Sequence, residues 1–167
     1  MNYMDRQFLI AQGFEGFKTM GELMDGARTR IPAQMGVYIV LRESELEPQF
    51  LSEGTGGHFK GQDPNVSLSE LIANWVEGTP VVYIGKAGGA GSTATLNKRL
   101  GQYLRFGQGA NVGHWGGRYI WQLADSRDLV VCWKTLTDDD PREVEHQMIA
   151  EFTAAHAGKR PFANLMD

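Results

Sequence analysis

Short apolar runs recur along the chain, each bounded by glycine, proline or polar residues, and such runs are typical of β-strands. Four of them are clear, at 35–41, 80–86, 119–123 and 129–136, and a weaker one covers 14–20. Their number and spacing predict one mainly antiparallel sheet.

Apolar residues at helical spacing occupy 67–76, 96–106 and 141–157, and a short helical turn is expected near 22–27. Because helices and strands interleave, the expected fold class is α+β, an α/β-type sandwich with a small, mainly antiparallel central sheet flanked by helices. Residues 43–65 are polar and contain several glycines. They are expected to form a flexible excursion between two strands.

The helix at 141–157 has the clearest start signal. Asp140 is expected to accept a hydrogen bond from the Glu143 amide as N-cap, Pro141 suits the first helical position, and Glu143 completes a capping box. On a helical wheel Glu145 falls within the apolar arc, where burying a carboxylate costs several kcal/mol unless a cation compensates. Two interpretations stay open: a site carboxylate that points inward, or a glutamate at the border of the buried face.

The helix at 96–106 has a stripe of three leucines that predicts its core face. Arg99 and Tyr103, four residues apart, flank this stripe, whereas Lys98 and Arg105 are expected to face solvent. An arginine in this position is either a structural partner, for Glu145 among others, or a site residue.

With 167 residues, 42% apolar and 22% charged, the chain has the composition of one soluble domain spanning 1–167. Its single Cys132 excludes an internal disulfide and a cysteine-cluster zinc site. No signal-like start and no apolar run of about 18 residues is present, so cytoplasmic residence without membrane contact is expected.

Charge is unevenly distributed along the chain. Residues 78–124 contain no acid but five basic residues, whereas the rest of the chain has a charge of −9, which gives −4 overall. The middle of the chain is therefore a candidate surface for a polyanion, although glycine and apolar enrichment alone also produces acid-free windows. Within it, His114, Trp115 and Arg118 are expected to share one exposed turn that either holds nucleic acid or is a plain glycine turn.

A nucleotide cofactor is not expected. The glycine-rich stretch 85–91 lacks the Gly-Lys-Ser/Thr core of a P-loop, and no second strand ending in an acid follows about twenty residues later. His58, His146 and His156 have no metal-ligand spacing.

Two tripeptides, Gly36-Val37-Tyr38 and Tyr83-Ile84-Gly85, each place a phenol on a predicted strand beside a glycine that leaves room for a ligand. With the segments Lys98-Arg99-Leu100-Gly101-Gln102-Tyr103, Glu145-His146-Gln147-Met148-Ile149 and Pro161-Phe162-Ala163-Asn164, they make the chain resemble a GIY-YIG nuclease domain over about residues 31–165. The extended motif Tyr83-Ile84-Gly85-Lys86-Ala87 is especially similar to the N-terminal incision domain of the bacterial excision-repair nuclease.

This resemblance implies a metal-dependent endonuclease that hydrolyses phosphodiester bonds in DNA by one-metal attack of a tyrosine-activated water. One Mg²⁺ or Mn²⁺ would bind Glu145, and Arg99 with Lys86 would bind phosphate or orient the water. Tyr38 is the preferred general base, a role that requires Lys86, Arg99 or the metal to lower its phenol pKa, and Tyr83 and Tyr103 would position water and phosphate.

The resemblance also implies supporting roles for residues outside that centre. Asn164 would hold the metal-bearing helix and a tyrosine by hydrogen bonds, and His114 would be an auxiliary phosphate ligand. The expected DNA-binding residues are Lys86, Arg99, Arg105, His114 and Arg118, and the DNA substrate includes branched or damaged forms.

The chain departs from the family pattern in spacing. Tyr38 and Tyr83 are 45 positions apart where the family has a short hairpin, so 43–78 is interpreted as an insertion that covers the site or selects substrate, and 1–30 as an N-terminal extension. Family members often carry a separate DNA-recognition domain, and none is expected within residues 1–167. The alternative function is a non-catalytic nucleic-acid-binding or protein-interaction module that retains the fold.

Overall fold

The computed structural model describes residues 4–165 and shows a mixed α+β protein around one antiparallel sheet. The four strands lie in the order β1-β4-β2-β3, which makes β3 an edge strand. They are β1 (Glu15–Thr19), β2 (Gly36–Leu41), β3 (Val81–Ala87) and β4 (Val130–Thr135). The coarse fold class, the antiparallel sheet and four of the five predicted strands are confirmed.

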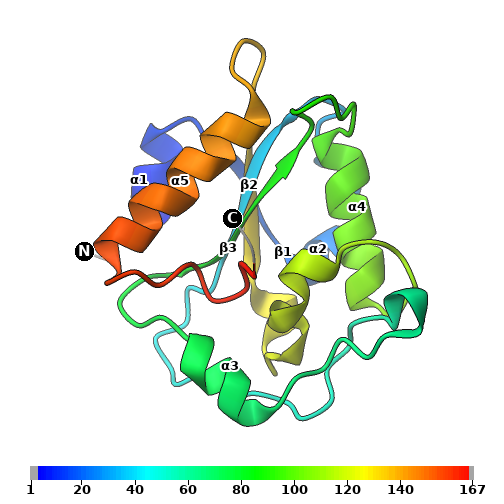
Figure 1. Ribbon diagram of the computed structural model, residues 1–167. Coiled ribbons are helices and arrows are strands. Elements are labelled where there is room, and N and C mark those ends of the chain that lie inside the picture. The colour runs from blue at the N-terminus through cyan, green and yellow to red at the C-terminus, as the bar shows by residue number, and fades with distance from the viewer. Residues whose placement is uncertain (1–3, 166–167) are drawn as a thin grey trace.

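Helices cover both faces of this sheet (Figure 1). On one side lie α1 (Arg6–Ala11) and α5 (Pro141–Ala155), and on the other α2 (Met20–Met24) and α4 (Leu96–Gly107). A further helix, α3 (Leu68–Asn74), lies below the sheet in the same view. Short 3-10 segments complete the fold: η1 (Ala27–Arg30), η2 (Phe59–Gly61), η3 (Trp115–Gln122) and η4 (Ser126–Asp128).

Side chains alternate between the two layers, as the two-residue period of a strand requires. Val37 and Ile39 of β2 pack in the cluster with α1 and α5, whereas Tyr38 and Val40 pack in the cluster with α2 and α4. Val40 is paired with Tyr83 of β3. This register therefore places Tyr38 and Tyr83 on the same face of the sheet.

The predicted strand at 119–123 is wrong. Residues 119–122 belong to η3, and Tyr119, Ile120 and Trp121 are all buried. A short, mostly apolar run fits a buried strand and a buried helical turn equally well, so periodicity cannot separate them. The helix α1, which Asp5 caps by accepting from the Phe8 amide, was not predicted.

The predicted capping of α5 is partly wrong. Pro141 occupies the start of the helix as expected, but Asp140 accepts from the Arg142 amide at 2.9 Å rather than from Glu143. An N-cap side chain bonds either the second or the third helical amide, and here it reaches the nearer one. The two reciprocal bonds of a capping box occur instead at α2.

The segment 43–65 is not a flexible excursion. Its backbone is bonded to the core elements, with Leu51 N donating to Gln122 O at 2.7 Å and Gly57 N to Phe106 O at 2.9 Å. A Cβ on Gly57 would lie 2.0 Å from the Ala110 carbonyl oxygen. Some of the glycines that indicated flexibility therefore serve close backbone packing instead.

Helices within residues 4–165 are too short or too polar to cross a membrane.

Candidate active site

A polar pocket of about 300 Å³ lies at the edge of the sheet beside β3. Its lining includes Tyr38 of β2, Tyr83 and Lys86 of β3, Arg99 of α4 and Glu145 of α5. Helices α4 and α5 lie on opposite sides of the sheet (Figure 1), so the edge strand is where their side chains meet. Five residues predicted from widely separated segments thus share one pocket.

The two motif glycines make room for protein atoms rather than for a ligand. Tyr38 is the cross-strand partner of Gly85, and a Cβ on Gly85 would lie 2.3 Å from Cζ of the Tyr38 ring. A Cβ on Gly36 would lie 2.1 Å from the Lys134 carbonyl oxygen. The expectation that these glycines leave space for a ligand is therefore wrong, because the phenol of Tyr38 and a neighbouring strand occupy that space.

Behind the pocket, three tyrosines and a histidine form one buried aromatic cluster. The Oη atom of Tyr38 lies 2.7 Å from Nε2 of His114, and the rings of His114 and Tyr103 stack with centroids 3.7 Å apart. Tyr103 donates its hydroxyl proton to the Gly117 carbonyl at 2.6 Å, and its ring centroid is 5.4 Å from that of Tyr83. Tyr103 therefore supports the pocket from behind.

His114 does not lie in an exposed turn, and that prediction is wrong. Its exposed fraction is 0%, and its Nδ1 has no hydrogen-bond partner among the described residues. Because Gly117 allows the Tyr103 hydroxyl within 2.4 Å of where its Cβ would lie, this turn packs against α4. His114 consequently cannot contact a phosphate in this conformation, and it contacts Tyr38 instead.

Burial dominates the acid-base properties of this cluster. It raises the pKa of the Tyr38 and Tyr103 phenols well above their usual range and that of Tyr83 to about 12, while nearby Arg99 acts in the opposite direction on each. Burial, with a contribution from Arg99, also holds the pKa of His114 well below its usual range. Arg99 thus acts in the expected direction, but desolvation outweighs its charge, so protein groups alone do not give the lowered phenol pKa that a general base requires.

Arg99 keeps part of its guanidinium free toward the pocket. Its Nη1 donates to the Gly113 carbonyl at 2.8 Å and to Oε1 of Gln102 at 3.2 Å. No acceptor among residues 4–165 bonds its Nε or Nη2. The side chain is therefore fixed by one nitrogen and has two donating nitrogens left for an anion.

Glu145 is the only carboxylate that lines the pocket in the described chain. Burial raises its pKa, although Lys86 and Arg99 act to lower it, and no cation of residues 4–165 pairs with it within 4 Å. No group of three or more His, Cys, Asp or Glu side chains in this part of the chain forms a metal cage. A single carboxylate beside open, polar space still fits Mg²⁺, which keeps several waters and takes its other ligands from substrate phosphate.

Asn164 fixes the edge strand. Its Oδ1 accepts from the Ile84 amide and its Nδ2 donates to the Ile84 carbonyl, both at 2.9 Å, and the neighbouring Ala163 amide donates to Val82 O at 2.8 Å. The terminal segment thereby covers the edge of β3 up to Ile84. Asn164 holds the strand between Tyr83 and Gly85, rather than the helix that carries Glu145.

The remaining predicted DNA-binding residues do not line the pocket. Arg105 is exposed on α4, and Arg118 lies over the Trp115 ring at 4.5 Å with its Nε buried and without a partner in the described chain. Their contact with DNA stays a prediction.

Sequence reasoning missed Gln102 and Ser92 as lining residues. Gln102 lies three residues after Arg99, and this spacing puts both side chains on one face of a helix. That spacing could have identified Gln102 as a lining residue. Ser92 lies in a glycine-rich loop that has no periodicity to interpret.

Comparisons of the chain with protein-family models, curated proteins and solved structures found no match. Any functional assignment therefore depends on the pocket and the residues that line it.

Proposed function

We propose that this chain is a GIY-YIG-type endonuclease that hydrolyses phosphodiester bonds in DNA with one Mg²⁺ or Mn²⁺. The observation that carries the proposal is the convergence of Tyr38, Tyr83, Lys86, Arg99 and Glu145 on one pocket. These are the residue types that binding a phosphodiester, activating a water and holding a divalent cation require.

Arg99 and Lys86 would bind the phosphate. The unbonded Nε and Nη2 of Arg99 present a planar pair of donors that matches two phosphate oxygens. Lys86 adds a second positive charge from β3, and its Nζ bonds the Gly88 carbonyl at 3.3 Å. A divalent cation on Glu145 would neutralise charge on the scissile phosphate and on the leaving 3′ oxygen.

Tyr38 acts as general base through His114. In the tautomer of His114 protonated at Nδ1, the Tyr38 hydroxyl donates to Nε2, which lies 2.7 Å away. The low pKa of His114 keeps the ring neutral, so Nε2 accepts this hydrogen bond in the resting protein, and it takes up a proton only as negative charge develops beside it at Tyr38. As Tyr38 takes a proton from the attacking water, its own proton passes to Nε2, the water oxygen bonds phosphorus, and the bond from phosphorus to the 3′ oxygen breaks. Solvent then protonates the leaving oxygen.

The competing function is a non-catalytic nucleic-acid-binding module with the same fold. The small number of carboxylates in the pocket favours this non-catalytic function, since Glu145 is the only one that lines it among the described residues. Such a module predicts DNA binding without hydrolysis under any metal.

Cleavage of supercoiled plasmid and of branched oligonucleotides with Mg²⁺ or Mn²⁺ separates the two functions. The nuclease predicts nicking by the parent protein and none by Glu145→Gln, with DNA binding by both proteins measured in Ca²⁺. Equal inertness of parent and variant on every substrate, with DNA binding intact, supports the module instead.

A further inference from the structure

Beside α3, away from the pocket above, the surface has an apolar groove of about 520 Å³. Leu68 and Ile72 of α3 lie one turn apart along one wall and are 43% and 64% exposed, and Phe50 and Trp75 also line the groove. A contiguous set of exposed large apolar side chains marks an interaction site more often than scattered single ones do.

The aromatic part of the groove, Phe50 and Trp75, is preformed. The rings of Phe50 and Trp75 lie 5.8 Å apart, and that of Trp75 lies 5.1 Å from the core residue Phe162, which is 2% exposed. Lys159 Nζ also donates to the Trp75 carbonyl at 3.1 Å. Because these side chains are already fixed by the core, a ligand that binds them loses little free energy to ordering the protein.

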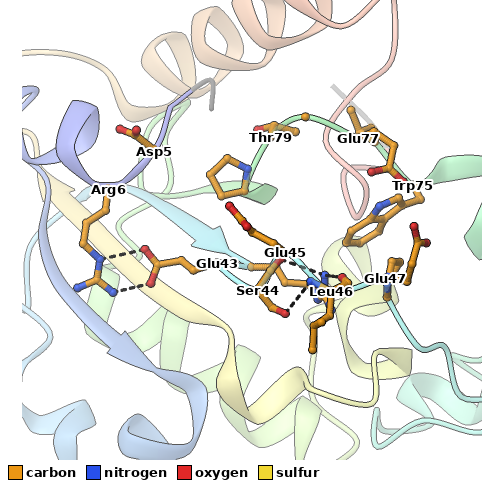
Figure 2. Close-up of a pocket in the computed structure, with 15 residues that line it drawn as sticks. Asp5, Arg6, Glu43, Ser44, Glu45, Leu46, Glu47, Trp75, Glu77 and Thr79 are labelled. Carbon is orange, nitrogen blue, oxygen red and sulfur yellow. Dashed lines mark hydrogen bonds and ion pairs between the residues drawn. The ribbon is translucent and has the colours of Figure 1, made fainter. Parts of the chain in front are cut away.

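The rim of the groove is acidic. Glu47 and Glu77 line it and also line an adjoining polar pocket that Glu45 and Trp75 share (Figure 2). Residues 43–78 contain seven acids and one lysine, so the negative charge of the chain concentrates here.

This negative charge is not neutralised within the described chain. Arg6 in the adjoining pocket pairs with Glu43 at 2.6 Å, and Arg42 pairs with Asp125 at 2.8 Å (Figure 2 shows the first pair). No cation of residues 4–165 lies within 4 Å of the carboxylates of Glu45, Glu47 or Glu77. These three glutamates therefore remain available to a ligand.

We propose that this surface, the α3 groove formed by Phe50, Leu68, Ile72 and Trp75 with its rim of Glu45, Glu47 and Glu77, docks a basic amphipathic segment of another protein. Apolar side chains of that segment would fill the groove while its lysines or arginines meet the glutamates. Pairing the groove with itself in a second copy would bring the glutamates face to face, which like-charge repulsion disfavours. No residue lines both this groove and the Tyr38 pocket, so docking leaves that pocket open and does not depend on nuclease activity.

The test is fluorescence anisotropy with two labelled probes and the full chain. One probe is a Leu/Lys peptide of about 18 residues patterned as an amphipathic helix, and the other has every Lys replaced by Glu. We expect the Leu/Lys peptide alone to bind, and Glu47→Lys/Glu77→Lys to weaken it about tenfold or more. The matched control, Glu15→Lys/Glu151→Lys, makes the same charge change at exposed positions outside the groove and should weaken it much less.

Ile72→Asp distinguishes docking from general charge attraction. It adds an acid to the surface, so simple electrostatics would strengthen binding of the Leu/Lys peptide, whereas docking in the apolar groove predicts a loss of about tenfold. Because Ile72 is mostly exposed, the variant should remain folded, which its melting curve checks. Equal effects of the two double variants, tighter binding by Ile72→Asp, or no binding of the Leu/Lys peptide would each overturn the proposal. A dimer in sedimentation velocity that Ile72→Asp dissociates would overturn it in favour of self-association.

Discussion

The ring of Tyr38 occupies the space that a side chain on Gly85 would need, with Cζ 2.3 Å from the position of the missing Cβ. The two residues are paired across β2 and β3, so glycine in the second motif is what allows the phenol of the first to reach His114. The Tyr38 ring packs against Tyr83, Tyr103 and His114, so a side chain on Gly85 would force the ring out of this arrangement.

Gly85→Ala should therefore displace the Tyr38 ring, lower the free energy of unfolding by about 1–3 kcal/mol, and reduce cleavage more than stability alone accounts for. Chemical denaturation and a cleavage assay at a temperature where the variant is folded measure both effects. Gly21→Ala is the matched control, since its Cβ would meet only ordinary contacts with Arg127 at 3.4 Å. Wild-type cleavage by folded Gly85→Ala would contradict the role of the Tyr38 position.

Asn164→Ala should cost about 3 kcal/mol, because it leaves the buried amide and carbonyl of Ile84 without their side-chain partners. Urea denaturation measures this loss. Asn74→Ala is the control, since Asn74 is exposed and makes one bond to the Glu70 carbonyl. Equal small losses in the two variants would show that Asn164 does not clamp β3.

His114 makes stability depend on pH in the acid range. Its folded pKa is depressed, so below the ordinary histidine value near 6.5 the unfolded chain binds more protons than the folded one. Stability should then be fully present above about pH 6.5 and fall as the pH drops, by at most about 1.4 kcal/mol per pH unit from this group. Unfolding curves between pH 7 and 5 should show a shallower decline for His114→Gln than for the exposed control His58→Gln. The same decline in both would contradict a neutral, buried His114.

Glu145 should make stability depend on pH in the opposite direction. Burial raises its folded pKa, so the ionised form at neutral pH destabilises the metal-free protein, and stability falls as the pH rises through that pKa. Glu145→Gln should therefore melt a few degrees higher than the parent in EDTA at pH 7 while losing cleavage. Thermal denaturation in EDTA measures the shift, and Glu143→Gln, exposed on the same helix, should leave the melting temperature nearly unchanged. A lower melting temperature for Glu145→Gln would mean that the carboxylate is structural.

The sequence predicted elements with clear periodicity well, and it failed where contact depends on tertiary packing. The Leu96, Leu100 and Leu104 stripe defined α4 and its buried face. The strands β2 and β3 followed from their apolar runs because nearly all their residues, on both faces of the sheet, are buried. In contrast, 119–123 has the composition of a strand but forms a 3-10 segment, and its Trp121 ring lies 2.3 Å from where a Cβ on Gly107 would be, a tertiary contact that local composition does not reveal.

At the site, too, local patterns were predictive and contacts that depend on tertiary packing were not. Local motifs located Tyr38, Tyr83, Lys86, Arg99 and Glu145, and the structure brings these five together. The bond between Tyr38 and His114 joins residues 76 positions apart, and no local pattern distinguishes a histidine buried in this way from one in an exposed glycine turn. The high phenol pKa values were missed for the same reason, since desolvation is a property of the packed core.

The most direct test of the central claim is the single-turnover rate of DNA cleavage by the parent, Arg99→Ala and Arg105→Ala proteins under identical Mg²⁺ or Mn²⁺ conditions. Arg99 lines the pocket with two unbonded nitrogens, whereas Arg105 is an exposed arginine on the same helix. We predict that Arg99→Ala lowers the rate by about 100-fold or more and that Arg105→Ala changes mainly the affinity for DNA. Cleavage by Arg99→Ala at the parent rate, or no cleavage by any of the three proteins on plasmid and branched substrates, would contradict the assignment of this pocket as a nuclease active site.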